Sequence, residues 1–165
     1  MISIGIPKGL FYFEYNVLWE EFFRNLGCKV VVSDDTNKLI LDCGVKYCSN
    51  ETCLPVKVFH GNAYSLKDKV DYVFIPRYTS VDKDEYTCPK FCGLPDMTLL
   101  NLKHQIRVLE IKIHVDLMPQ ETFKSLKEIA SILSLKYSDV VEAFEKAFKT
   151  YDNSREHTFK LKQYM

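Results

Sequence analysis

The sequence predicts a three-layer α/β domain with a mainly parallel sheet and a C-terminal helical segment. Short apolar runs alternate with segments of helical periodicity over residues 2–75, as expected of strands connected by helices. The first two runs are continuously apolar, which is typical of parallel strands covered on both faces. After Pro119 the helical periodicity continues without further strand-like runs.

The composition favours one folded domain over residues 1–165, with a sheet core at 1–116 and helices at 117–165. The formal net charge of +0 predicts no nucleic-acid partner and no anionic membrane surface. No apolar run reaches the ~20 residues of a membrane span. No signal peptide is recognisable, so we expect a cytoplasmic protein with reduced cysteines.

The first half of the chain reads as strand, helix, strand. Ile2–Ile6 is an apolar run that ends at a Pro-Lys-Gly loop, as a buried strand does. Helical spacing of apolar residues predicts a helix over Tyr12–Leu26, and Gly27 is a natural stop. Cys28–Val32 is the second predicted strand.

Two further helices and a strand are expected next. Ser33–Thr36 can cap a short helix. Another helix is expected to start near Cys53, because Pro55 fits only the first turn of a helix, and to run towards Asp68. Val70–Ile75 is the third predicted strand.

The remaining elements follow the same logic. A helix should open at Gly93–Asp96, and the alternation over Val108–Val115 predicts a half-exposed or edge strand. Apolar spacing predicts a helix over Phe123–Leu133 and a longer one capped by Ser138. The apolar face of this last helix is a candidate partner surface, and it consists of Val141, Phe144, Phe148 and Tyr151.

Two short segments carry five of the six cysteines. These are Cys43, Cys48, Cys53, Cys88 and Cys92. The segments are separated by one strand, so their loops could converge at one edge of the sheet. Soft thiolates suit either Zn or an iron–sulfur cluster, and the usual C-x2-C zinc spacing is absent. From spacing alone a cluster, a Zn site and buried core cysteines all remain open; Cys28 stands apart and reads as structural.

Five short motifs occur in order along the chain. They are Ile6-Pro-Lys-Gly-Leu10, Glu51-Thr-Cys-Leu-Pro-Val-Lys57, Phe59-His-Gly61, Ile75-Pro-Arg77 and Cys88-Pro-Lys-Phe-Cys-Gly-Leu-Pro-Asp96. Together they resemble the acyl-CoA dehydratase activase-related proteins, which are relatives of 2-hydroxyacyl-CoA dehydratase component subunits. The resemblance implies a Rossmann-like fold, a [4Fe–4S] cluster held by cysteines, and a link to ATP-dependent one-electron activation in anaerobes.

The resemblance also implies a ligand set. Cys53 and Cys88 match the two strongest motif cysteines, and Cys48 is the expected third ligand. Three thiolates would leave one iron open to another ligand. Cys92 stands where the pattern has an apolar residue, and Cys43 is a spare candidate.

The chain departs from such relatives in two respects. It stops where they continue into a second α/β half, and it has no phosphate-loop motif of an ATPase. We therefore assign no ATP site. The expected partners are an ATP-dependent activator, a second α/β half or a second copy of the chain.

Four charged or titratable residues are further candidates. Lys8 and Arg77 should follow the carboxyl ends of the first and third strands, where open α/β sheets bind ligands, although solvated loop charges are the alternative. Lys57 shares a helix face with Cys53 and could balance cluster charge. His60 could donate protons or could be a satisfied helix histidine.

The leading functional prediction is an iron–sulfur domain that acts in low-potential one-electron transfer. If it is enzymatic, it belongs to a 2-hydroxyacyl-CoA dehydratase-like lyase or a reductase system. A non-catalytic module braced by Zn or a cluster is one alternative. A small-molecule-binding α/β domain without metal is another, and it would need an apolar pocket at the strand ends.

Overall fold

A computed structural model describes residues 1–81, 85–113 and 118–163 of the chain. Its main sheet has four parallel strands in the order β2-β1-β3-β5. These strands are β1 (Ser3–Ile6), β2 (Lys29–Val32), β3 (Tyr72–Phe74) and β5 (Val108–Leu109). The described helices are α1 (Tyr12–Asn25), α2 (Lys38–Tyr47), α3 (Leu54–Ser65), α4 (Pro89–Cys92), α5 (Leu94–Asn101), α6 (Met118–Leu133) and α7 (Tyr137–Gln163).

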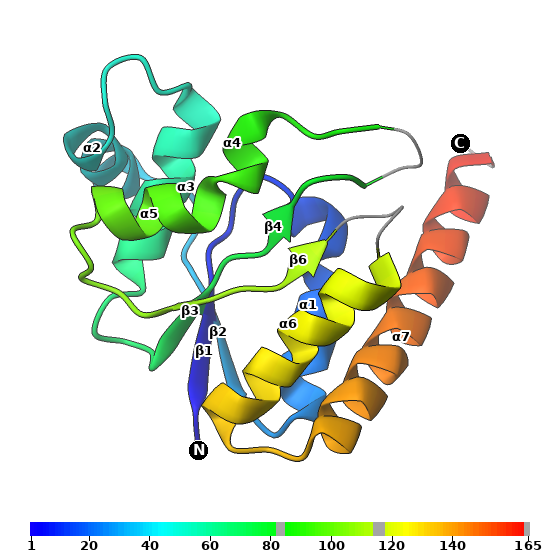
Figure 1. The fold of residues 1–165 in the computed structure, drawn as a ribbon. Helices are drawn as coiled ribbons and strands as arrows, with labels where there is room; N and C mark the ends of the chain where they lie inside the picture. Colours follow the sequence, from blue (N-terminus) through cyan, green and yellow to red (C-terminus); the bar gives the residue numbers. More distant parts are fainter. Residues whose placement is uncertain (82–84, 114–117, 164–165) are drawn as a thin grey trace.

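The sheet lies between two layers of helices, which confirms the predicted three-layer α/β fold (Figure 1). Successive residues of each strand point to opposite faces. Ile4 and Phe74 pack on one face with α1, α6 and α7, while Val73 and Ile75 pack on the other face with α3 and α5. Helix α2 packs against α3. Each face has its own apolar core, as expected of a buried parallel sheet.

A second pair of strands extends the sheet beyond Pro76. Strand β4 (Arg77–Tyr78) pairs in parallel with β6 (Lys112–Ile113). The backbone N–H groups of Ile75, Arg77 and Thr79 donate in a regular series to the carbonyls of Leu109, Ile111 and Ile113, so the pairing continues from β5 into β6. The single strand expected over Val108–Val115 is therefore two short strands, with β5 at the edge of the main sheet. Residues 114–117, where that strand and the predicted boundary at 116 would end, lie outside the described residues.

Two predicted helix caps are corrected. Helix α2 is capped by Asn37, whose side-chain oxygen accepts a hydrogen bond from Ile40 N at 3.1 Å, and not by Ser33–Thr36. This helix runs on through Cys43, which the sequence placed in a loop. Helix α7 begins at Tyr137, so Ser138 lies in its first turn.

The apolar face of α7 is packed inside the chain. Its buried residues are Val140, Ala143, Ala147 and Tyr151. They pack against α1 and α6. Of the predicted face, Tyr151 is buried, Val141 and Phe144 are half-buried against the same core, and Phe148 is exposed. The small Ala143 and Ala147 allow close helix contact. This face therefore gives no argument for a partner. Among the described residues, no helix has the length and apolar character needed to cross a membrane.

Candidate functional site

The strand order reverses between β1 and β3. The chain passes from β1 to β2 on one side and returns to β3 on the other. Loops at the carboxyl ends of two such strands diverge, and ligands of open α/β sheets usually bind between them. Here the loop Pro7–Phe11 follows β1, and β4 with Arg77 follows β3. This edge of the sheet is therefore the expected location of a ligand site.

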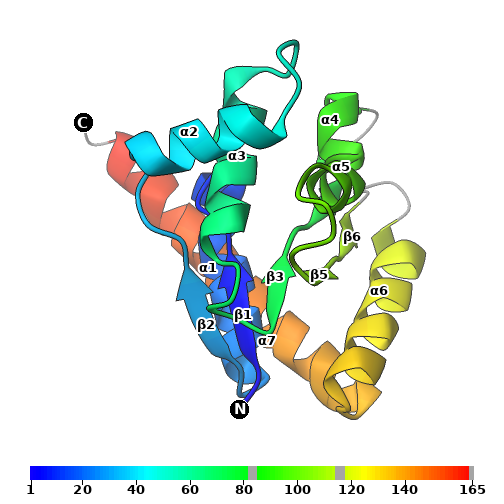
Figure 2. The same cartoon turned by 90° about the vertical axis from the view of Figure 1, so that its left-hand side faces the viewer.

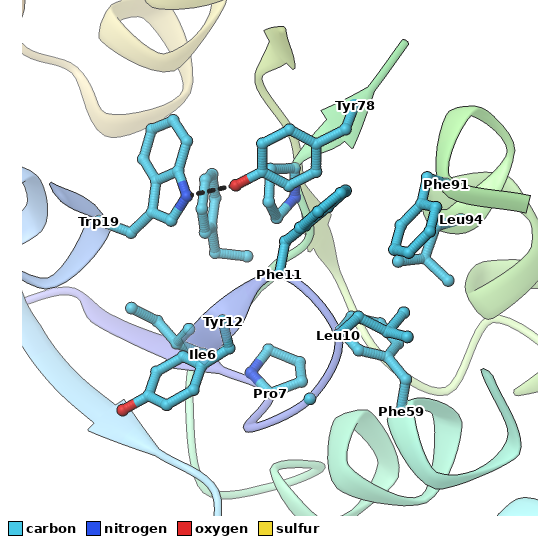
Figure 3. Close-up of a pocket in the computed structure, with 13 residues that line it drawn as sticks. Ile6, Pro7, Leu10, Phe11, Tyr12, Trp19, Phe59, Tyr78, Phe91 and Leu94 are labelled. Atoms are coloured by element: carbon cyan, nitrogen blue, oxygen red, sulfur yellow. Dashed lines mark hydrogen bonds between the residues drawn. The ribbon is translucent and has the colours of Figure 1, made fainter. Parts of the chain in front are cut away.

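An apolar slot of about 20 Å³ lies between these loops (Figure 3). Phe11 lies at its centre, with Trp19 and Tyr78 on one side and Phe59 and Phe91 on others. The Trp19 indole N–H donates to the Tyr78 hydroxyl at 2.7 Å, and both side chains are buried. Ligand pockets typically have ~300–1,000 Å³, so a small molecule does not fit this slot as it stands.

The loop after β1 is fixed by a buried polar network. The backbone N–H of Lys8 donates to Ser33 Oγ at 2.8 Å, and Ser33 Oγ donates to Asn62 Oδ1 at 2.9 Å. The Lys8 ammonium pairs with the exposed carboxylate of Asp35. Lys8 therefore follows the first strand as predicted, but its charge is already paired.

Three cysteines lie around the connection between α2 and α3. Cys43 is in α2, Cys48 is the residue at the C-terminal end of α2, and Cys53 is the N-cap of α3. Cys48 is buried, whereas Cys53 is exposed. The helix start predicted at Cys53 is confirmed, and Pro55 lies in its first turn as expected. Lys57, one turn further along α3, donates from Nζ to the carbonyl of Asn50 at 3.1 Å and so closes the loop.

These side chains share one electrostatic environment. Burial raises the pKa of the Cys48 thiol; the charge of Lys57 opposes this effect, and the thiols of Cys43 and Cys53 add to it. Burial also raises the pKa of Cys43. The charge of Lys57 therefore favours a Cys48 thiolate. Its role in balancing the charge of a cluster stays a prediction.

The second cysteine segment forms the short helix α4. Cys88 is its exposed N-cap, and Cys92 is its half-buried last residue. Between them Phe91 packs on Phe11 with ring centroids 4.5 Å apart. The aromatic slot therefore holds α4 against the loop that follows β1.

Arg77 is a clamp for this segment. Its guanidinium donates to the carbonyl of Cys92 at 2.6 Å, to Asp96 Oδ2 at 2.8 Å and to Glu110 Oε2 at 2.8 Å. Two carboxylates thus neutralise one largely buried guanidinium. Two of these contacts hold α4 and α5, and the third joins Arg77 to Glu110 between β5 and β6. The substrate-binding role of Arg77 stays a prediction.

We expect Arg77→Ala to lower the free energy of unfolding by about 2–3 kcal/mol, because it leaves two carboxylates and a carbonyl without their partner. Arg77→Lys should recover only part of this loss, since an ammonium cannot reproduce the bidentate pairing. Urea unfolding measures both. Lys146→Ala breaks an exposed pair with Glu142 and is the control, with an expected cost below about 0.5 kcal/mol. Equal costs for Arg77→Ala and Lys146→Ala would contradict the clamp.

His60 is fully buried in α3. Its Nδ1 lies 2.8 Å from the carbonyl of Val56, and its Nε2 lies 3.1 Å from Asn101 Nδ2. Burial lowers its pKa, against the opposing effect of the carbonyls of Val56 and Met97. Both ring nitrogens have partners and the ring is shielded from solvent, which favours the satisfied helix histidine over the proton donor. The reasoning from sequence missed Asn101, because no spacing rule connects it with His60.

The two cysteine segments lie at the same end of the molecule (Figures 1 and 2). Phe59 of α3 and Phe91 of α4 both line the slot. Cys43, Cys48 and Cys53 lie in α2 or in its connection to α3, and Cys88 and Cys92 lie at the two ends of α4. In the described parts of the chain, no three His, Cys, Asp or Glu residues are arranged to hold a metal ion. The predicted set of Cys48, Cys53 and Cys88 thus remains a prediction.

Comparison with known proteins gives one match. A protein-family model described as "CoA enzyme activase uncharacterised domain (DUF2229)" matches residues 3–165. No curated protein and no solved structure matches the chain.

Proposed function

This chain belongs to the CoA enzyme activase family, and from that membership we propose that it is an iron–sulfur-binding domain acting in low-potential one-electron transfer. The match over residues 3–165 confirms the resemblance predicted from the five motifs. The cluster and the electron transfer are the proposal, and they rest on the cysteines.

One observation carries the proposal. Cys53 and Cys88 each occupy the N-cap of a helix with an exposed thiol, at the same end of the sheet. Neither side chain contributes a cap hydrogen bond, and neither is part of the apolar cores. Accessible thiols are prone to oxidation, so a purely structural role does not explain why these two exposed positions carry cysteine.

The donor chemistry fits a thiolate-ligated cluster. Cys48, Cys53 and Cys88 would hold it, and Lys57 would offset part of the negative charge of these thiolates. The thiols form two groups, one at the connection between α2 and α3 and one at α4, and among the described residues no three potential ligands are arranged to hold a metal ion. Ligation by both groups would require α4 and the α2–α3 loop to approach each other, or a further ligand from a second protein.

When bound, a [4Fe–4S] cluster supplies a one-electron carrier whose potential is set by its surroundings. The residues of the chain would hold that carrier at the edge of the sheet, with two ligands exposed to a partner. An ATP-dependent activator or a second α/β half would be the proposed partner. The aromatic slot would keep one side of the site dry.

Anaerobic purification with metal analysis tests the proposal. We expect iron and acid-labile sulfide in equal amounts, with a brown colour and a broad absorption band that bleaches on reduction. Zinc without iron would instead support a structural brace. If neither metal remains after anaerobic purification and reconstitution, the iron–sulfur proposal is wrong.

A further inference from the structure

A side-chain link connects the two cysteine segments. Asn101 is the last residue of α5. Its Nδ2 lies 3.1 Å from His60 Nε2 in α3 and 4.0 Å from Cys48 Sγ at the end of α2. These residues are 41 and 53 positions away from Asn101 in the sequence. Helix α5 follows α4 after a single residue, so Asn101 belongs to the segment that carries Cys88.

The hydrogen-bond directions follow from the partners. In the tautomer that carries its proton on Nδ1, His60 donates to Val56 O, since a carbonyl oxygen can only accept. His60 Nε2 then has a free lone pair and accepts from the Asn101 amide. An amide nitrogen has two N–H groups, and the second is available to the Cys48 sulfur. The reversed amide would place its oxygen against the lone pair of His60 Nε2.

We infer that Asn101 is a positioning residue for Cys48, joining it through a half-buried amide to His60 and to the helix that follows Cys88. The buried imidazole fixes the amide, and the amide fixes the sulfur. The positioning itself does not need a metal ion. Its consequence for a cluster rests on the proposed function, because N–H donors to ligand sulfurs stabilise the more negative, reduced cluster.

The direct test is site-resolved alkylation of the reduced, metal-free full chain, followed by mass spectrometry of the cysteine peptides. We expect Asn101→Ala to raise the alkylation rate of Cys48 about tenfold relative to Cys28, because the sulfur loses its donor and its fixed neighbour. Cys28 lies in another part of the core and serves as an internal reference. Asn101→Asp keeps the side-chain volume but lacks the N–H donors, and it should also release Cys48.

Asn62→Ala is the matched control. Asn62 is a fully buried amide within α3, and its side chain hydrogen-bonds to Ser33 and Val58, neither of which is a cysteine. It should change the alkylation of Cys48 and Cys28 equally, through overall stability alone. An unchanged Cys48 rate in both Asn101 variants, or a parallel rise at Cys28, would overturn the inference.

A second readout separates the inference from the proposed function. After anaerobic reconstitution, Asn101→Asp should retain less iron than the wild type and should have a more negative midpoint potential. If the wild type takes up no iron while the alkylation result holds, the proposed function fails and the positioning role stands. If the wild type binds a cluster but the Asn101 variants alkylate like the wild type, only the positioning role fails.

Discussion

Replacing Cys48, Cys53 or Cys88 by serine is expected to remove most of the iron and sulfide from the reconstituted protein. A serine hydroxyl has nearly the size of a thiol, but it is a much harder ligand and is not ionised near neutral pH. The structure makes this a sharp test, because Cys53 and Cys88 are exposed and their replacement should leave the fold intact. Iron and sulfide content after anaerobic reconstitution is the measurement, with far-UV circular dichroism to check the fold.

Two serine variants serve as controls. Cys28→Ser should keep the cluster and cost about 1–2 kcal/mol of unfolding free energy, because Cys28 is half-buried against the main core. Cys92→Ser should also keep the cluster, since the contact made by Cys92 to Arg77 uses its backbone carbonyl. If Cys92→Ser empties the site while Cys48→Ser leaves it full, the ligand set is wrong. The centre would then be built on Cys88 and Cys92, with Cys53 and Cys43 as candidates to complete it.

The sheet and its order of elements could be predicted because each signal was local. Continuous apolar runs marked β1 and β2, and Pro55 marked the start of α3 within one residue. Such signals depend on neighbouring residues in the chain, so they can be recognised without knowledge of the tertiary fold. The caps of α2 and α7 were misplaced, because several polar residues near each start can serve as caps and only the backbone decides among them.

The contacts that organise the site could not be predicted, because they join residues far apart in sequence. Arg77 looked like a free cation after a strand until Glu110 and Asp96 were placed beside it. The sequence left His60 open between a proton donor and a satisfied helix histidine, and the contact of its second nitrogen with Asn101 favours the latter. A charged or titratable residue in a motif is therefore weak support for a ligand site until its partners are known.

The roles of the residues in the motif Phe59-His60-Gly61 also depend on contacts with residues far away in the sequence. It was recognised only as part of a resemblance, yet each residue has a physical task in the structure. Phe59 lines the aromatic slot, and His60 holds Asn101. Gly61 lets α2 and α3 pack at very short range, because a Cβ built there would lie 1.9 Å from the carbonyl oxygen of Ile40.

The contact between α2 and α3 is reciprocal. A Cβ built at Gly44 in α2 would likewise lie 1.9 Å from the carbonyl oxygen of Lys57 in α3. Ile40 is four residues before Gly44, and Lys57 is four residues before Gly61. Each helix therefore places a glycine against a carbonyl of the other helix, and this glycine lies one turn away from the carbonyl that the helix presents in return. No side chain lies between the helices at these two points. Any other residue must push the helices apart.

We therefore expect Gly61→Ala and Gly44→Ala each to destabilise the protein by about 3 kcal/mol. Alanine favours a helix over glycine by about 1 kcal/mol, but this gain is outweighed by overpacking against a backbone carbonyl that cannot rotate away. Urea unfolding measures the change. Gly93→Ala is the matched control, because its Cβ would meet Pro89 O at 3.6 Å, an ordinary contact. It should alter stability by less than about 0.5 kcal/mol.

The glycine variants should also disturb the site, because the connection between α2 and α3 carries Cys48 and Cys53. Forcing the helices apart moves Cys48 away from Asn101, so its alkylation should rise at urea concentrations where the fold persists. Gly93→Ala, beside the other cysteine segment, should leave Cys48 protected. A Gly61→Ala protein as stable as the wild type would mean that the two helices can separate without cost, and the α2–α3 pair would then be too loose to hold Cys48 in place.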